Sequence, residues 1–172
     1  MRGGGVAAVS ISEIMARAGM TQGGFYNHFE SKGALIAEAC LSGFARSVHN
    51  WKSKVGPPRS LASGALKRLV SYYLRKKPAE QGCPMVALGQ DASPHHGSGE
   101  LNRAYKTGVE QLFTTFKEIV RSDPSCSMSE EELLVAFSAM VGANMLSRAT
   151  GDKKWASGVE KGILSTFVYG RA

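Results

Sequence analysis

The stretch Ser10-Ile-Ser-Glu-Ile-Met-Ala-Arg-Ala-Gly-Met-Thr-Gln-Gly-Gly-Phe-Tyr-Asn-His-Phe29 decides the fold of this chain. Ser10 lies three residues before Glu13, a spacing at which each side chain can satisfy a free backbone amide at the start of a helix. Apolar residues then recur on one helical face until Gly19, which predicts the end of this short helix. Thr21 is expected to cap a second short helix that buries Phe25 and Phe29.

Two short helices joined by a tight, glycine-containing turn can place the second helix in the major groove of DNA. Gln22 can offer a donor and an acceptor to an adenine edge, whereas Tyr26 and Lys32 can hydrogen-bond to phosphate oxygens. Glycine costs about 1 kcal/mol relative to alanine within a helix, and a close approach of the backbone to DNA would explain why Gly23 and Gly24 are tolerated. The predicted DNA-binding residues are Thr21, Gln22, Gly24, Tyr26, Asn27, His28 and Lys32.

The run from Ser10 to Leu35 resembles the DNA-binding segment of TetR-type repressors. Its most specific part is Gly24-Phe-Tyr-Asn-His-Phe29, followed by Ser31-Lys32 and Leu35. The resemblance implies that Thr21, Gln22 and Gly24 face the groove and that Tyr26, His28 and Lys32 reach phosphates. It also implies a variable C-terminal region that binds a ligand and dimerises through its last two helices. The alternative for the segment alone is a plain helical hairpin with Tyr26 and His28 as ordinary surface residues.

Apolar residues repeat at three and four along almost every long segment, which predicts an all-α fold. Ser31 is expected to cap a long helix that Gly56-Pro57-Pro58 stops. Further helices are expected over 60–77, over 84–92, from Leu101 to near Asp123, and from a Ser129/Glu132 cap onwards. A last helix carries Trp155, Val159, Ile163 and Phe167 at four-residue steps. We divide the chain into a DNA-binding module over 1–55 and a ligand-binding and dimerisation domain over 56–172.

Composition fits a globular protein of the cytoplasm. Hydrophobic residues make up 43% of the 172 residues and charged residues 20%, with no apolar run expected to cross a membrane and no secretory signal. Three widely spaced cysteines, Cys40, Cys83 and Cys126, argue against a disulfide framework or paired zinc ligands. The net charge of +7 is spread along the chain, so it is compatible with a nucleic-acid partner without identifying one.

Aromatic and methionine side chains of the C-terminal region are candidates for lining an effector site, although ordinary core packing uses the same residue types. These candidates are Tyr72, Tyr73, Met85, Phe113, Phe116 and Met140. The candidate dimer interface consists of Met140, Trp155, Val159, Ile163 and Phe167, because the apolar stripes of the last two helices are too broad for a monomer surface.

Other features are weaker. Cys83, before Pro84 at a helix start, can be a redox-sensing thiol or simply a small packed residue, and packing is favoured. His95-His96 lacks further metal ligands, and no metal, cofactor or catalysis is expected. A helical protein-interaction or thiol-sensing protein without operator binding is the alternative function.

We therefore expect a homodimeric transcriptional regulator that binds a palindromic DNA operator and leaves it when a small molecule binds. Only Met1–Val9 precedes Ser10, whereas TetR-type modules begin with an additional helix, and Gly3–Gly5 disfavour a helix there. We hypothesise that the chain is truncated and lacks most of that first helix. Ile11, Met15 and Phe25 should then face water.

Overall fold

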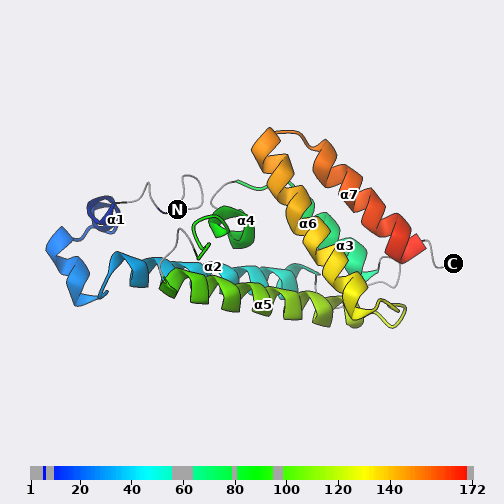
Figure 1. Ribbon diagram of the computed structural model, residues 1–172, viewed down its shortest axis with the longest axis horizontal. Coiled ribbons are helices and arrows are strands. Elements are labelled where there is room, and N and C mark those ends of the chain that lie inside the picture. The colour runs from blue at the N-terminus through cyan, green and yellow to red at the C-terminus, as the bar shows by residue number, and fades with distance from the viewer. Residues whose placement is uncertain (1–5, 7–9, 56–63, 79–80, 95–98, 170–172) are drawn as a thin grey trace. The chain divides into compact units, whose positions relative to one another are not determined.

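The computed structural model describes residues 6, 10–55, 64–78, 81–94 and 99–169, which contain helices and no strand. The all-α prediction is confirmed. Figure 1 shows these helices along the chain. The chain divides into two compact units. Unit 1 comprises residues 1–46 and 77–110, and unit 2 comprises 47–76 and 111–172, so two long helices contribute to both.

Unit 1 begins with α1 (Ile11–Arg17), η1 (Gln22–Asn27) and the first half of α2 (Lys32–Val55). The predicted cap of α1 is present, because Ser10 Oγ accepts from the Glu13 amide and the Glu13 carboxylate accepts from the Ser10 amide. Gly19 has a φ of 70°, a conformation that suits glycine and ends the helix. Ser31 caps α2 as expected, with its Oγ 2.9 Å from the Ala34 amide nitrogen.

The second predicted helix differs from expectation, because η1 is a 3₁₀ helix and the Thr21 side chain makes no capping hydrogen bond. Phe25 is fully buried and stacks on the half-buried Phe29, with ring centroids 5.6 Å apart. Phe25 is buried as the helix-turn-helix pattern predicts, and Met15 is buried too, although the missing-helix hypothesis expected both to face water; Ile11 is half-buried. Residues 1–5 and 7–9, on which the missing-helix hypothesis depends, lie outside the described residues.

The remainder of unit 1 is built from α4 (Pro84–Leu88) and the first half of α5 (Gly99–Arg121). The α4 helix ends four residues earlier than predicted, and α5 begins at Gly99, two residues before the predicted start at Leu101. Tyr105 Oη donates to the Met85 carbonyl at 2.8 Å, and Asn102 Nδ2 donates to the Ala92 carbonyl at 2.9 Å. Side chains of α5 therefore hold α4 and the turn after it.

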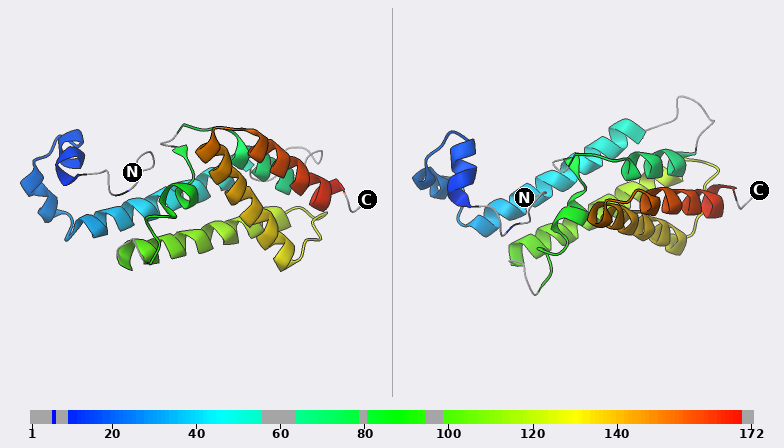
Figure 2. Two further views of the ribbon diagram at one scale, coloured as in Figure 1. Left: turned by 45° about the horizontal axis from the view of Figure 1, so that its top comes forward. Right: turned by 90° about the horizontal axis from the view of Figure 1, so that it is seen from above.

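Unit 2 contains α3 (Ala65–Leu74), α6 (Glu130–Thr150), α7 (Lys154–Leu164) and a π-helical continuation, η3 (Ser165–Tyr169). The views in Figures 1 and 2 show α6 and α7 side by side, with α3 against both. The Ser129/Glu132 cap of α6 is present as predicted, and Gly151, with a φ of 71°, ends that helix. The second halves of α2 and α5 complete the unit.

The core of unit 2 is aromatic and aliphatic. The rings of Phe113, Phe116 and Phe137 contact one another, with Phe116 fully buried. Trp51 meets Tyr73 edge to face at 5.7 Å between ring centroids. By length and composition α6 is apolar enough to cross a membrane, contrary to our expectation for this chain. One such helix is weak evidence for a membrane span; 28% of its apolar window is buried, and the buried side chains of α6 include Leu133.

Candidate nucleic-acid interface

The interface candidate is the surface of η1, which α1 and the turn at Gly19 hold in place. Met20 ends that turn by donating its amide to the Met15 carbonyl at 2.9 Å, and Met15 itself is buried. Within η1, the Gly24 amide donates to the Thr21 carbonyl and the His28 amide to the Phe25 carbonyl. The buried Phe25 ring therefore anchors a short helical segment whose other side faces solvent.

Most of the predicted DNA-binding side chains lie on that solvent-facing side. Thr21, Gln22, Tyr26, Asn27 and His28 are exposed, whereas Gly24 and Lys32 are half-buried. Together the exposed groups offer hydroxyl, amide and imidazole functions, the donors and acceptors that duplex DNA can receive at base edges and phosphates.

Tyr26 is held in place by an aromatic contact although the residue is 67% exposed. The ring meets Phe25 edge to face, with centroids 5.1 Å apart. An aromatic contact of this kind orients the phenol while leaving its hydroxyl in solvent. Tyr26 is thus a pre-positioned hydrogen-bonding group among the exposed residues of η1.

The two glycines of η1 are not required by the fold. Neither has a positive φ, and a Cβ placed on Gly23 would meet no atom within 4 Å. A Cβ on Gly24 would make only ordinary contacts, the nearest with Thr21 Oγ1 at 3.6 Å. The described structure therefore accepts alanine at Gly23, even though glycine weakens a helix.

Glu13, the acidic side chain of α1, is occupied by the cap of that helix. Hydrogen bonds from the amide and hydroxyl of Ser10 hold the pKa of Glu13 below its usual value, and Arg17 adds to this. The carboxylate is thereby tied to the start of α1.

The predicted effector residues separate between the two units. Tyr72, Tyr73, Phe113, Phe116 and Met140 belong to unit 2, and Met85 belongs to unit 1. Tyr73, Phe116 and Met140 are buried, whereas Tyr72 and Phe113 are half-buried. Arg75 lies over the Tyr72 ring at 5.6 Å and Lys117 over the Phe113 ring at 5.1 Å, so these two rings face the unit's charged surface.

Cys83 precedes α4 and is half-buried. Burial raises the pKa of the neighbouring Tyr105 phenol to about 12, and the thiols of Cys83 and Cys40 contribute to the same shift. Cys83 thus lies near a neutral phenol, which lacks the positive charge that stabilises a thiolate. His95 and His96 lie outside the described residues, among which no cluster of three His, Cys, Asp or Glu forms a metal site.

The residues predicted for the dimer interface differ in their exposure within the single chain. Met140 is fully buried and Ile163 is 5% exposed, so neither side chain is available to a partner. Val159 and Phe167 are half-buried, and Trp155 is exposed. The predicted interface residues of α7 are four residues apart, and each four-residue step exceeds one helical turn by about 40°. The series of side chains therefore passes from the outer to the inner side of α7 between Trp155 and Ile163.

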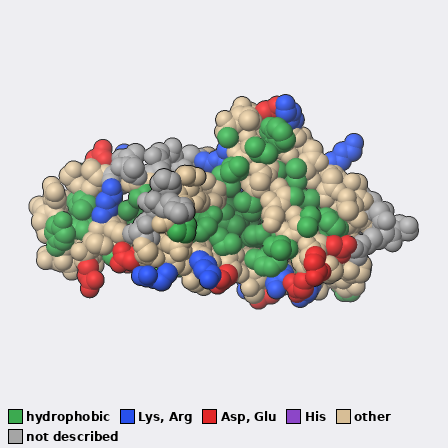
Figure 3. Space-filling view, in the orientation of Figure 1, with side chains coloured by type: hydrophobic (Ala, Val, Ile, Leu, Met, Phe, Trp, Pro, Cys, Tyr) green, Lys and Arg blue, Asp and Glu red, His purple; other side chains and the backbone are tan. Residues whose placement is uncertain are grey.

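Sequence reasoning expected a broad apolar surface on the last two helices but did not identify the residues that α6 exposes. Leu134, Val135 and Met145 are each more than half exposed, and hydrophobic side chains gather over α6 in Figure 3. Leu133, Leu134 and Val135 are consecutive, and three consecutive residues of a helix cannot all face one core. That run of three apolar residues was the sequence signal for an exposed apolar side of α6.

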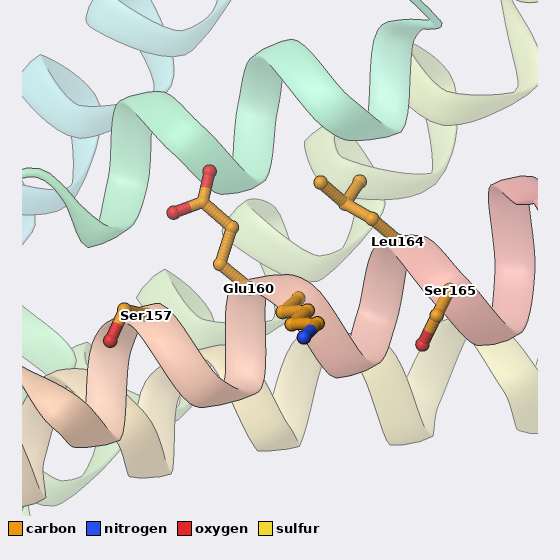
Figure 4. A pocket seen from close by; sticks show the side chains of 5 residues that line it. Ser157, Glu160, Leu164 and Ser165 are labelled. Carbon is orange, nitrogen blue, oxygen red and sulfur yellow. The ribbon is translucent and has the colours of Figure 1, made fainter.

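A shallow, solvent-open hollow runs along α7 and is lined by Ser157, Glu160, Lys161, Leu164 and Ser165. Glu160 and Leu164 point towards α3 (Figure 4), and the Glu160 carboxylate accepts a 2.5 Å hydrogen bond from Ser71 Oγ of that helix. This carboxylate joins α7 to α3, and none of our predicted site residues lines the hollow.

Comparison with known proteins agrees with this geometry. Residues 1–39 match the family model described as bacterial regulatory proteins, tetR family, and this range contains η1 and the exposed residues around it. No curated protein sequence matches the chain significantly.

Solved structures share the fold across almost the whole chain. Escherichia coli NemR in its reduced form is similar with a TM-score of 0.77 and 17% identity, over 95% of this chain and 88% of that one. A TetR transcriptional regulator from Legionella pneumophila gives 0.74 and 17% over 94% and 88%. One from Chloroflexus aurantiacus J-10-FL gives 0.74 and 19% over 94% and 86%.

Proposed function

The chain has the N-terminal segment and the fold of the TetR/AcrR family of transcriptional regulators, and from that premise we propose that it is a homodimeric repressor of transcription. It binds a palindromic DNA operator through η1 and α2 and releases it when a small molecule binds the C-terminal part of the chain. The protein acts in the cytoplasm and performs no catalysis.

One observation carries the proposal. Residues Gln22 and Tyr26–His28 are exposed on an element fixed by the fully buried Phe25, within the segment that matches the family model. A rigid scaffold that presents polar groups is what base and phosphate recognition requires. In this proposal Thr21, Gln22, Gly24 and Asn27 face the groove, and Tyr26, His28 and Lys32 hold phosphates.

The absence of a side chain at Gly23 supports the proposal that η1 faces the groove of DNA. Since its space and backbone conformation accept alanine, a benefit outside the chain must offset the cost of glycine in a helix. Close contact between this backbone and the groove is that benefit in our proposal.

Release follows from two conformations of the dimer. A ligand that binds one conformation more tightly shifts the population towards it by its difference in affinity. In the favoured conformation, the separation of the two η1 elements no longer matches successive major grooves, which lie about 34 Å apart.

Two experiments test the proposal. Selection from a random duplex pool should yield a palindromic sequence. On that sequence, Lys32→Ala should lower affinity for operator and random duplex alike, and reduce the slope of log affinity against log salt by roughly one per subunit.

The matched control is Lys153→Ala, which removes the same charge from the α6–α7 connection and should leave the slope unchanged. Failure to enrich any sequence would refute operator binding. An equal effect of both substitutions on the slope would refute the role of Lys32.

A further inference from the structure

A hydrogen bond joins two parts of unit 1 that are far apart in the sequence. Asp91, in the turn after α4, accepts through its Oδ2 from the Val6 amide at 3.2 Å. Both residues are half-buried, and both belong to unit 1. Val6 precedes Ser10, the cap of α1, by four positions. The bond therefore connects the end of α4 with the chain just ahead of the α1–η1 segment (residues 10–29).

The position of Asp91 is set by α5. The Ala92 amide donates to the Leu88 carbonyl at 2.9 Å, and the Ala92 carbonyl accepts from Asn102 Nδ2 of α5 at 2.9 Å. Ala92 itself is 2% exposed. The residue that follows Asp91 is thus fixed at both its amide and its carbonyl, so the carboxylate extends from a turn that α5 holds.

The carboxylate and the amide satisfy each other. Asp91 forms no ion pair within the part of the chain that the structure describes. A half-buried carboxylate needs hydrogen-bond donors, and an amide that donates to a charged acceptor makes one of the stronger hydrogen bonds of proteins. The Val6 amide supplies this donor, and Val6 lies outside the helices, where its amide has no helical acceptor.

The bond limits how far the α1–η1 segment can move from α4. An extended chain covers at most about 3.6 Å per residue, so the four steps from Val6 to Ser10 span at most about 14 Å. While the bond holds, the start of α1 stays within that distance of the Val6 amide. At its other end the segment is restrained by α2, because Ser31 caps that helix two residues after Phe29.

We propose that Asp91 is a positioning residue for DNA binding: its bond to Val6 ties the α1–η1 segment to α4, and a shift of α4 that breaks the bond weakens operator binding. This inference rests on the proposed function and adds a contact through which α4 acts on η1. A segment restrained at both ends loses less conformational entropy when DNA fixes it. Linkage makes the effect reciprocal, so operator binding strengthens the bond.

Removal of the acceptor and removal of the donor should have the same effect. Asp91→Ala deletes the carboxylate and Val6→Pro deletes the amide hydrogen, so each should lower operator affinity about fivefold, the equivalent of one hydrogen bond. The double variant should be no weaker than either single variant. Loss of a negative charge by itself favours binding to DNA, so the charge of Asp91 does not explain a weaker Asp91→Ala.

Two conservative variants are the matched controls. Val6→Ala keeps the backbone amide, and Asp91→Asn keeps a side-chain oxygen as acceptor. Both should bind the operator at least as tightly as wild type. Additive losses in the double variant, or equal weakening by Asp91→Asn and Asp91→Ala, would overturn the proposal.

Amide hydrogen exchange follows the bond without requiring DNA. In the free protein, Asp91→Ala should speed exchange in the α1–η1 segment and leave α6, in unit 2, unchanged. Operator DNA should slow exchange of the Val6 amide in wild type, and less so in Asp91→Ala. Unchanged exchange of the segment in Asp91→Ala would also overturn the proposal. Wild-type protein that enriches no operator would refute the proposed function, whereas exchange in the free protein would still decide whether Asp91 holds the segment.

Discussion

At Gly108, α5 lies against the ring of Phe44 from α2 so closely that a Cβ would overlap three ring carbons. We expect Gly108→Ala to destabilise unit 1 by roughly 1–3 kcal/mol, because an added methyl group in a packed core displaces its neighbours. Urea unfolding measures the change. Gly23→Ala is the control, since its methyl group would meet no atom within 4 Å.

The overlap also predicts coupling between the two positions. Phe44→Leu alone leaves a gap, but combined with Gly108→Ala it provides room for the new methyl group. The double variant should therefore be more stable than the sum of the single effects indicates. Simple additivity would show that the ring of Phe44 does not set the approach of these helices.

Asp123 stabilises the start of α3 from 58 positions away in sequence. Its Oδ2 accepts from the Ala65 amide at 3.0 Å. Hydrogen bonds from the Ser125 hydroxyl, the Ala65 amide and the Ser125 amide lower the pKa of Asp123, with a contribution from the charge of Arg68. A carboxyl whose pKa is lower in the folded state stabilises the fold above its unfolded pKa of about 3.9. That contribution is lost as pH falls through the folded pKa.

Asp123→Asn should therefore lower the free energy of unfolding at pH 7 by about 1 kcal/mol, the usual contribution of a helix cap. The difference from wild type should shrink as pH falls below about 4. Thermal unfolding from pH 7 to pH 3 measures this difference in stability, and Glu110→Gln, at an exposed position, is the control. A difference that stays constant across this range would contradict a role for the carboxylate charge.

At the scale of elements, the sequence predicted the helix starts and ends that are determined by residues close together in the chain. Ser10 with Glu13, Ser129 with Glu132, and Gly19 at a helix end are local signals, and each element that they mark was located correctly. The cap of α3 by Asp123 was not predictable, because the two groups meet only after folding. The missing Thr21 cap has the same origin, since tertiary packing of Phe25 sets the geometry of η1.

The same difference between local signals and tertiary packing applies to the candidate sites. The exposed residues of η1 could be inferred from a short, specific run, but the outer side of α6 could not be located from apolar content alone. Burial of Met140 and Ile163 depends on how α6 and α7 are rotated in unit 2, and four-residue spacing does not specify that rotation.

The exposed side of α6 predicts which substitution separates the proposed dimer. Val135 is 58% exposed and Ile163 is buried, so Val135→Glu places a charge on the surface and Ile163→Glu places one in the core. We expect Val135→Glu to halve the mass in sedimentation without a large change in monomer stability. Ile163→Glu should lower the stability itself, because a buried unpaired charge is costly. Retention of dimer mass in Val135→Glu would exclude this side of α6 as the interface.

Glycines on α6 and α7 support the proposal that these helices provide the contact surface of the dimer. A Cβ added at Gly142 on α6, or at Gly158 and Gly162 on α7, would meet no atom within 4 Å in the monomer. Each glycine weakens its helix by about 1 kcal/mol. In the proposed dimer, close packing against the helices of a second copy would offset that cost, since small residues let helix backbones approach.

For the whole molecule, twofold symmetry predicts how operator geometry controls affinity. Two η1 elements of one dimer should bind half-sites about 34 Å apart on the same side of the duplex. Five base pairs inserted between the half-sites of the selected operator rotate one of them to the opposite side and move it about 17 Å away. Wild-type affinity should then fall roughly a thousandfold, towards the non-specific level.

The Val135→Glu monomer supplies the comparison that identifies the cause. A monomer contacts a single half-site, so its affinity should be low and the same on the original and the expanded operators. Electrophoretic mobility shift at one fixed salt concentration measures both proteins on both duplexes, because salt alone changes such affinities by orders of magnitude. Equal wild-type affinity for the two spacings would mean that the chain reads DNA as independent subunits. Release by an effector could not then operate through the separation of the η1 elements, and the proposed mechanism would have to act within one subunit.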